Sequence, residues 1–252
     1  MYDHHTKAGN PGDVIKHVAL IAAANVIMQS CGNTFHYADT YAGYAFNPIK
    51  SKGEWQDGIG AIHDNQAEIR NQDVRFWREL WDCRYGLEGS VYPGSSIFMR
   101  KLCMKNGVRF LARLWDISPA VITQLKTAYT SNEAEINDRA VTMEDFIAQK
   151  PDLLLIDPPD FADVGKALTF FDVADNVILW LPVTTVDGTE TAASSGAFSL
   201  CNDKGLQSVT AIWGGNKNTR GCRLIYKLSP PAEEAVMIAV SEVSVGLNWQ
   251  VR

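Results

Sequence analysis

The hydrophobic pattern of the chain alternates between short apolar runs and longer stretches with helical spacing. The apolar runs are continuous and several end at an acidic residue, which is typical of strands buried on both faces of a sheet. Seven strands are predicted, over 34–39, 109–116, 139–143, 152–157, 176–183, 206–213 and 222–228. Five helices are predicted, over 13–29, 96–106, 119–130, 162–174 and 232–243. This alternation predicts an α/β fold with a mostly parallel, seven-stranded sheet.

Residues 47–92 do not fit this alternation. They hold Trp55, Phe76, Trp77 and Trp81 among many charged residues, a composition that favours a small helical unit with its own core. We therefore expect a single domain over 1–252 with a helical insertion subdomain over 47–92, after the first strand. The small, polar stretch 184–205 predicts no particular element.

Composition narrows the class of protein. Hydrophobic residues make up 46% and charged residues 21% of the chain, which is close to the average of globular proteins. No apolar run approaches the roughly 18 residues that cross a bilayer, and no secretory signal is recognisable, so we expect a cytoplasmic protein without a membrane span. The five cysteines lack paired spacing, which argues against a disulfide framework or a metal site. The formal net charge of −6 disfavours nucleic acid unless a local basic patch compensates for it.

Acidic residues follow four of the predicted strands, at Asp39, Asp116, Asp145 and Asp157. Ligands of doubly wound sheets bind beyond the carboxyl ends of the strands, so these acids predict a nucleoside-binding edge. Asp116 could bond ribose hydroxyls, and Asp145 could hold an adenine edge. The loop after the first strand has one glycine, Gly43, where a phosphate-cradling loop has three, which favours S-adenosylmethionine over a dinucleotide.

Asp157 is followed by Pro158 and Pro159. Both prolines fix their own φ and restrict the preceding residue, so the turn would present the Asp157 carboxylate and proline carbonyls rigidly. Such acceptors can hold the two N–H groups of an exocyclic amine. The nitrogen lone pair would then point at a donor methyl group, which is catalysis by positioning.

The order of several motifs resembles the bacterial 23S ribosomal RNA adenine-N6 methyltransferase family, also described as external-DNA utilisation proteins. The motifs are AGNPGDVIKH (8–17), DTYAG (39–43), GEWQDGI (53–59), VYPGSS (91–96), LIDPP (155–159), LWLPV (179–183) and RGCRLIYKLSPP (220–231). The resemblance implies a Rossmann-like, S-adenosylmethionine-dependent methyltransferase fold. It also implies ribosomal RNA as the partner.

The resemblance further implies a set of site residues. Those expected to bind S-adenosylmethionine are His17, Tyr41, Ser95, Asp116, Asp145, Phe146 and Asp157. Asp157 would also be the catalytic residue, and the substrate would contact Tyr2, His4, Lys16, Pro158 and Phe161. The N-terminal members form a basic cluster in an otherwise acidic chain, made of His4, His5, Lys7, Lys16 and His17.

The chain departs from the family pattern at the site. The family has DPPY, whose aromatic ring stacks on the flipped base; here Asp160 stands at that position and Phe161 follows it. Tyr41 replaces a usual histidine, and Phe146 replaces a usual glycine. Three hypotheses therefore remain open: adenine-N6 methylation of 23S ribosomal RNA, a non-catalytic member that binds nucleic acid or protein, and a methyltransferase with a substrate other than RNA.

Overall fold

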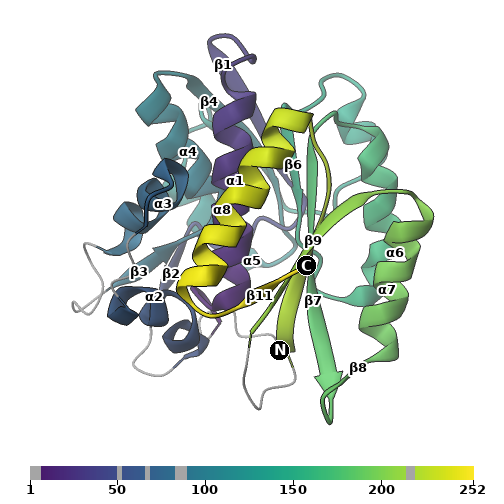
Figure 1. The fold of residues 1–252 in the computed structure, drawn as a ribbon. Coiled ribbons are helices and arrows are strands. Elements are labelled where there is room, and N and C mark those ends of the chain that lie inside the picture. The colour runs from purple at the N-terminus through teal and green to yellow at the C-terminus, as the bar shows by residue number, and fades with distance from the viewer. Residues whose placement is uncertain (1–6, 50–52, 66–68, 83–89, 214–218) are drawn as a thin grey trace.

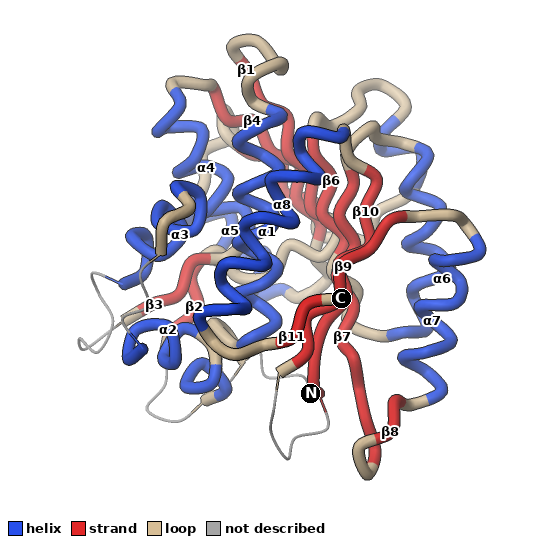
Figure 2. Tube along the Cα trace, viewed as in Figure 1, coloured by secondary structure: helices blue, strands red, loops and turns tan. Residues whose placement is uncertain are grey.

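A computed structural model describes residues 7–49, 53–65, 69–82, 90–213 and 219–252. One large sheet runs through the molecule in the order β11-β9-β10-β7-β6-β1-β4-β5, with β8 paired to the end of β7 (Figures 1 and 2). Its strands are β1 (Thr34–Asp39), β4 (Arg109–Trp115), β5 (Ala134–Asn137), β6 (Leu153–Ile156), β7 (Val177–Val186), β8 (Thr189–Glu190), β9 (Gln207–Ile212), β10 (Thr219–Lys227) and β11 (Gln250–Val251).

The sheet is parallel from β5 through β4, β1 and β6 to β7, whereas β10 runs antiparallel to both β7 and β9. The strand order runs from β1 through β4 to β5 and resumes on the other side of β1 with β6 and β7, and β10 lies antiparallel between β7 and β9. This order is that of a Rossmann-like methyltransferase fold. The mostly parallel α/β fold predicted from the sequence is confirmed. In the described residues the sheet has nine strands rather than the expected seven, because the two-residue strands β8 and β11 extend it.

Helices cover both faces of this sheet (Figure 1). Those on one face share a core cluster, and they are α1 (Pro11–Ile27), α3 (Gln72–Asp82), α4 (Ser95–Asn106), α5 (Pro119–Ala128) and α8 (Pro230–Gly246). The second cluster lies under α6 (Val164–Ala167), the 3₁₀ turn η5 (Leu168–Asp172) and α7 (Ala192–Asp203). Both faces are thereby buried, as continuous apolar strands require.

Helix α1 lies between α8, α3, α4 and the sheet, and it is buried along most of its length. Its start follows from local chemistry: the Asn10 side chain accepts a hydrogen bond from the Asp13 N–H, and Pro11 occupies the first turn. A helix that is apolar nearly all round is suited to such a central position. The polar residues of α1 that are nevertheless buried, Lys16 and His17, must find partners inside the protein.

Between β1 and α4 the chain forms short helices and a two-stranded antiparallel ribbon. These elements are β2 (Phe46–Pro48), η2 (Glu54–Asp57), α2 (Ile59–Asn65), α3 and β3 (Val91–Pro93). Trp77 and Trp81 of α3 are buried with their rings edge to face, 5.2 Å between centroids. The tryptophans of this segment thus serve packing in the described residues.

The predicted strand over 139–143 is wrong. The third parallel strand is β5, and residues Met143–Phe146 form the 3₁₀ turn η3 instead. The physical reason is a capping box, in which the Thr142 side chain and the Asp145 carboxylate each bond the other residue's backbone N–H. Reciprocal capping of this kind closes a helical turn and competes with strand pairing.

The stretch 184–205, for which the sequence predicts no element, contains the end of β7, the β7–β8 hairpin and α7. Helix α7 begins at Thr191, whose side chain accepts a hydrogen bond from the Ser194 N–H. Arg223 of β10 pairs with Glu190 at 2.6 Å and ties the hairpin to the sheet. Among the helices of the described residues, none is both long and apolar enough to span a membrane.

Candidate active site

A cavity of about 1820 Å³ opens at the carboxyl ends of the parallel strands. Its walls come from the start of α1, the loop after β1, the residues after β4 and β6, and the ends of β7 and β9. Single ligand pockets usually enclose roughly 300–1,000 Å³. The cavity therefore has room for two ligands side by side.

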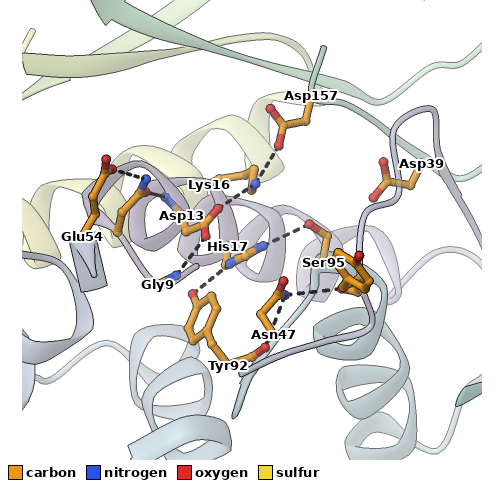
Figure 3. Close-up of polar contacts among 12 residues, drawn as sticks. Gly9, Asp13, Lys16, His17, Asp39, Asn47, Glu54, Tyr92, Ser95 and Asp157 are labelled. Atoms are coloured by element: carbon orange, nitrogen blue, oxygen red, sulfur yellow. Dashed lines mark hydrogen bonds and ion pairs between the residues drawn. The ribbon is translucent and has the colours of Figure 1, made fainter. Parts of the chain in front are cut away.

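Lys16 and Asp157 both line this cavity and contact each other (Figure 3). The Lys16 Nζ lies 2.7 Å from Asp157 Oδ2 and 2.8 Å from Asp13 Oδ1. Burial opposes the ammonium charge, but the two carboxylates hold the pKa of Lys16 well above its usual value. Lys16 is thus a fixed positive charge beside Asp157 and cannot act as a base at neutral pH.

Asp13 connects this pair to the segment ahead of α1. Its Oδ2 accepts a hydrogen bond from the Gly9 N–H at 3.0 Å, while its Oδ1 faces Lys16. Although burial favours the protonated carboxyl, the charge of Lys16 and the hydrogen bonds from Lys16 and the Gly9 N–H lower the pKa of Asp13, which stays ionised. The sequence did not identify Asp13 as a site residue; its place three residues before Lys16 on a helix was the available signal.

His17 joins three elements through its two ring nitrogens (Figure 3). Nδ1 lies 2.8 Å from the Tyr92 hydroxyl, and Nε2 lies 3.0 Å from Ser95 Oγ. Burial, followed by the charge of Lys16, lowers the pKa of His17 to about 3, so the ring is neutral. Because the Tyr92 hydroxyl accepts from Trp77 Nε1, it can donate its own proton to Nδ1, and Nε2–H then donates to Ser95.

Asp39 ends β1 inside the cavity wall and is almost fully buried. Its carboxylate accepts hydrogen bonds from the Tyr37 hydroxyl at 2.9 Å and the Tyr41 N–H at 3.2 Å. Burial raises the pKa of Asp39 to about 7. The sequence marks Asp39 as a strand-end acid but does not assign it a place among the site residues.

Asp116 closes the loop after β1 against the end of β4. Its Oδ2 accepts from the Gly43 N–H at 3.1 Å, and its Oδ1 accepts from the Ser118 N–H at 2.7 Å. Gly43 has a φ of +61°, a conformation that side chains disfavour. Asp116, Tyr41 and Ser95 all line the cavity.

Asp145 and Phe146 lie outside the cavity, unlike the other described candidates. Asp145 pairs with Arg139, whose hydrogen bond is the chief cause of a pKa of about 2, and it caps Thr142 N–H at 2.8 Å. Phe146 is buried in the second core cluster, 5.5 Å from the Trp115 ring. Residues 139–141 line the cavity near these two residues, whereas Asp145 and Phe146 themselves do not.

Pro158 and Phe161, which were expected to contact substrate, line the cavity. Phe161 is half-buried in the wall, one residue beyond the position where the family has tyrosine. Asp160 has a structural role, since its side chain accepts from Ala162 N–H at 3.0 Å and caps the 3₁₀ turn η4 (Phe161–Asp163). Tyr2 and His4, expected to contact substrate, lie outside the described residues.

Comparison with known proteins places this geometry in context. No family model matches the chain. Ribosomal RNA large subunit methyltransferase J of Haemophilus influenzae is 29% identical over 120 residues, which cover 45% of this chain and 42% of that protein. The match therefore spans less than half the length of that relative. The expected resemblance is confirmed.

One solved structure shares this fold. Protein LPL1258 of Legionella pneumophila, assigned to the family model DUF519, matches with a TM-score of 0.74 at 17% identity, over 97% of each chain. A SAM-dependent methyltransferase of Leishmania major matches with a TM-score of 0.40 at 12% identity, over 85% of this chain and 73% of that chain. The first similarity extends over the whole fold, insertion included.

Proposed function

We propose that the chain is an S-adenosylmethionine-dependent methyltransferase that acts on an exocyclic amino group, adenine N6 of large-subunit ribosomal RNA. The observation that carries the proposal is the position of Asp157. Its carboxylate follows a central parallel strand, precedes two prolines and faces the same cavity as the donor-side residues. The name of the Haemophilus influenzae relative supports ribosomal RNA as the acceptor.

The donor would occupy the side of the cavity nearest β1 and β4. S-adenosylmethionine supplies a methyl group on a positively charged sulfur, and the carboxylates of this wall complement that charge. Asp116 would accept from the ribose hydroxyls, and Tyr41, Ser95 and neutral His17 would contact the rest of the donor. Asp145 and Phe146 were expected at the adenine; from their positions they would act through the 139–141 segment that they support.

The amine would be held on the Asp157 side. Its two N–H groups would donate to the Asp157 carboxylate and the Pro158 carbonyl, which leaves the nitrogen lone pair directed at the methyl group. The Lys16 ammonium holds the Asp157 carboxylate in place through a 2.7 Å hydrogen bond to Oδ2. Phe161 would stack on the base. No strong base is needed, because the nitrogen loses its proton after the methyl group has been transferred.

A second acceptor class is favoured by the charge of the cavity. Carboxylates outnumber cationic side chains among its described lining residues. The acids are Asp13, Asp39, Glu54, Asp57, Asp116, Asp157, Asp160 and Asp163, and the cations are Lys7, Lys16, Arg139 and Lys166. A methyltransferase for a small molecule or peptide amine fits this balance better than a phosphate-rich acceptor does.

Asp157→Asn tests the proposal. Asparagine fills the same space but removes the charge that opposes Lys16 and one acceptor for the amine. We expect transfer of a labelled methyl group to unmodified 23S ribosomal RNA to fall by ~100-fold or more. S-adenosylhomocysteine affinity, measured by calorimetry, should stay within a few-fold.

Asp172→Asn is the matched control, because Asp172 is an exposed acid that does not line the cavity. Near-normal turnover of Asp157→Asn would remove Asp157 from the mechanism. A folded wild-type protein that binds neither S-adenosylmethionine nor S-adenosylhomocysteine would refute the enzymatic proposal. Donor binding without transfer to RNA would favour the second acceptor class.

A further inference from the structure

Three tryptophans line the cavity on the side away from the donor residues: Trp180 of β7, Trp213 after β9 and Trp249 before β11. All three lie at the margin of the core cluster covered by α1 and α8. Each remains half-buried. Trp77, Trp81 and Trp115, by contrast, are buried completely, with at most 1% of their surface exposed.

Trp213 and Trp249 form a cross-strand pair. Gln250 pairs with Ile212 in the antiparallel ladder, which places Trp249 opposite Trp213 one position beyond it. Their ring centroids are 5.6 Å apart with an interplanar angle of 51°. The two rings already contact each other, so a ligand would meet the side of the pair that borders the cavity.

The backbone ahead of Trp249 is shaped to hold it there. Asn248 has a φ of +55°, uncommon for a residue with a side chain, and it lines the cavity itself. The Trp249 N–H donates to the Ser244 carbonyl at 2.8 Å, which fixes the turn at the end of α8. Conformations of this kind persist where the surrounding structure requires them.

The pair lies within reach of the reacting centre. Trp180, the third tryptophan of the cavity wall, has its ring centroid 5.7 Å from the Lys16 Nζ that contacts Asp157. In the sheet, β6 is followed by β7, β10 and then β9. The register places Asp157 level with Trp180, Leu224 and Val209, so Trp213 lies three strand spacings across the sheet and four residues further along it. These offsets are ~14 Å and ~13 Å, respectively. That span corresponds to a few nucleotides of a single strand.

We propose that Trp213 and Trp249 form a stacking platform for a nucleobase that flanks the target base in a single-stranded nucleic acid. The proposal rests on the proposed function, since it takes the acceptor to be a nucleic acid. Aromatic rings bind bases without requiring phosphate contacts, so the acidic lining of the cavity does not oppose this recognition. The platform also explains how a chain with net charge −6 could hold RNA.

The test is a double-mutant cycle with short RNA. The probes are single-stranded oligonucleotides with one adenine in a uridine background, together with versions in which each flanking base in turn is abasic. Affinity is measured by fluorescence anisotropy in the presence of S-adenosylhomocysteine. The variants are Trp249→Leu, which keeps an apolar side chain but removes the aromatic face, and Trp249→Phe, which keeps an aromatic face. Val245→Ala, an exposed position of α8 outside this cavity, is the control.

We expect one flanking abasic site to weaken binding to the wild type by about 5- to 150-fold. Trp249→Leu should lose affinity for the intact probe by a similar factor and show no further loss at that abasic site. Trp249→Phe should recover most of the affinity, and donor affinity should remain unchanged in both.

If the wild type binds the probes but Trp249→Leu remains sensitive to the same abasic site, the platform is refuted while the proposed function stands. A wild type that binds S-adenosylhomocysteine but none of the probes would refute the nucleic-acid acceptor and the platform together. Trp213→Leu repeats the cycle if Trp249→Leu fails to fold.

Discussion

Asp39 is a buried carboxyl whose ionisation opposes folding. Burial raises its pKa to about 7 from an ordinary value of 3.8. The raised pKa contributes fully to the free energy of unfolding below about pH 4, where Asp39 is protonated in both the folded and the unfolded protein. This contribution is lost as the pH rises through about 7, where Asp39 ionises in the folded protein. Asp39→Asn should therefore gain stability relative to the wild type over this range, by ~4 kcal/mol at most.

Urea denaturation at a series of pH values checks this expectation. Asparagine can still accept one of the two hydrogen bonds that Asp39 accepts from Tyr37 and Tyr41. Parallel stability curves for the variant and the wild type would show that Asp39 is not protonated in the folded protein near neutral pH.

Asp160 has a structural role at a position where the family that the chain resembles has an aromatic residue. Its side chain caps the 3₁₀ turn that begins with Phe161. Asp160→Tyr should lower the free energy of unfolding by about 0.5–2 kcal/mol, because the cap is lost. Methyl transfer to adenine should rise or stay unchanged. A folded variant without activity would give Asp160 a role of its own in the reaction.

The close approach of two elements fixes the donor side of the cavity. Gly94 precedes α4, and a Cβ at this position would lie 2.2 Å from the Tyr44 carbonyl oxygen. Gly94→Ala must therefore separate the loop after β1 from the start of α4, where Ser95 contacts His17. We expect a loss of roughly 2 kcal/mol or more in stability and weaker S-adenosylhomocysteine binding.

Gly165→Ala is the matched control for that measurement, since nothing lies within 4 Å of the added Cβ in α6. It should be neutral or should stabilise by up to ~1 kcal/mol. Equal effects of the two substitutions, measured by urea denaturation and calorimetry, would contradict the close contact at Gly94.

The sequence predicts the elements well where apolar runs are continuous. It predicts them poorly where capping hydrogen bonds determine whether a helical turn forms. Strands β1, β4 and β6 were expected close to their observed bounds, because a buried strand leaves a plain apolar signal. The strand expected over 139–143 was wrong because Thr142 and Asp145 close a turn, and that reciprocal bond depends on geometry rather than on hydrophobicity. Helix α7 was missed for a related reason: its Ala- and Ser-rich sequence has little apolar periodicity, and its cap at Thr191 starts it.

The candidate site is predictable to the level of strand ends. Asp116 and Asp157 lie at the cavity as their positions after strands suggest. The pairing of Lys16 with Asp157 joins positions 141 residues apart, which local patterns do not reveal. The burial of Phe146 likewise depends on Trp115 and Phe170, which come from other elements.

For the whole molecule, charge limits how RNA can be held. A net charge of −6 and an acidic cavity leave few sites for phosphate contacts. We expect the logarithm of RNA affinity to fall only shallowly with the logarithm of salt concentration, with a slope of about −1.4 if about two phosphates are neutralised. Anisotropy titrations across a salt series measure this slope. A slope several times steeper would show that a basic surface, rather than stacking, dominates binding.

Helices α1 and α8 pack side by side although nearly the whole sheet lies between them in the chain. The side of α1 that packs on α8 therefore stays uncovered until α8 has been synthesised. Contacts between distant parts of a chain slow folding, and exposed apolar surface in the interval favours aggregation. The helix that carries Lys16 and His17 thus needs protection on the ribosome, and the cavity can be completed only after residues 247–249, which line it, have been synthesised.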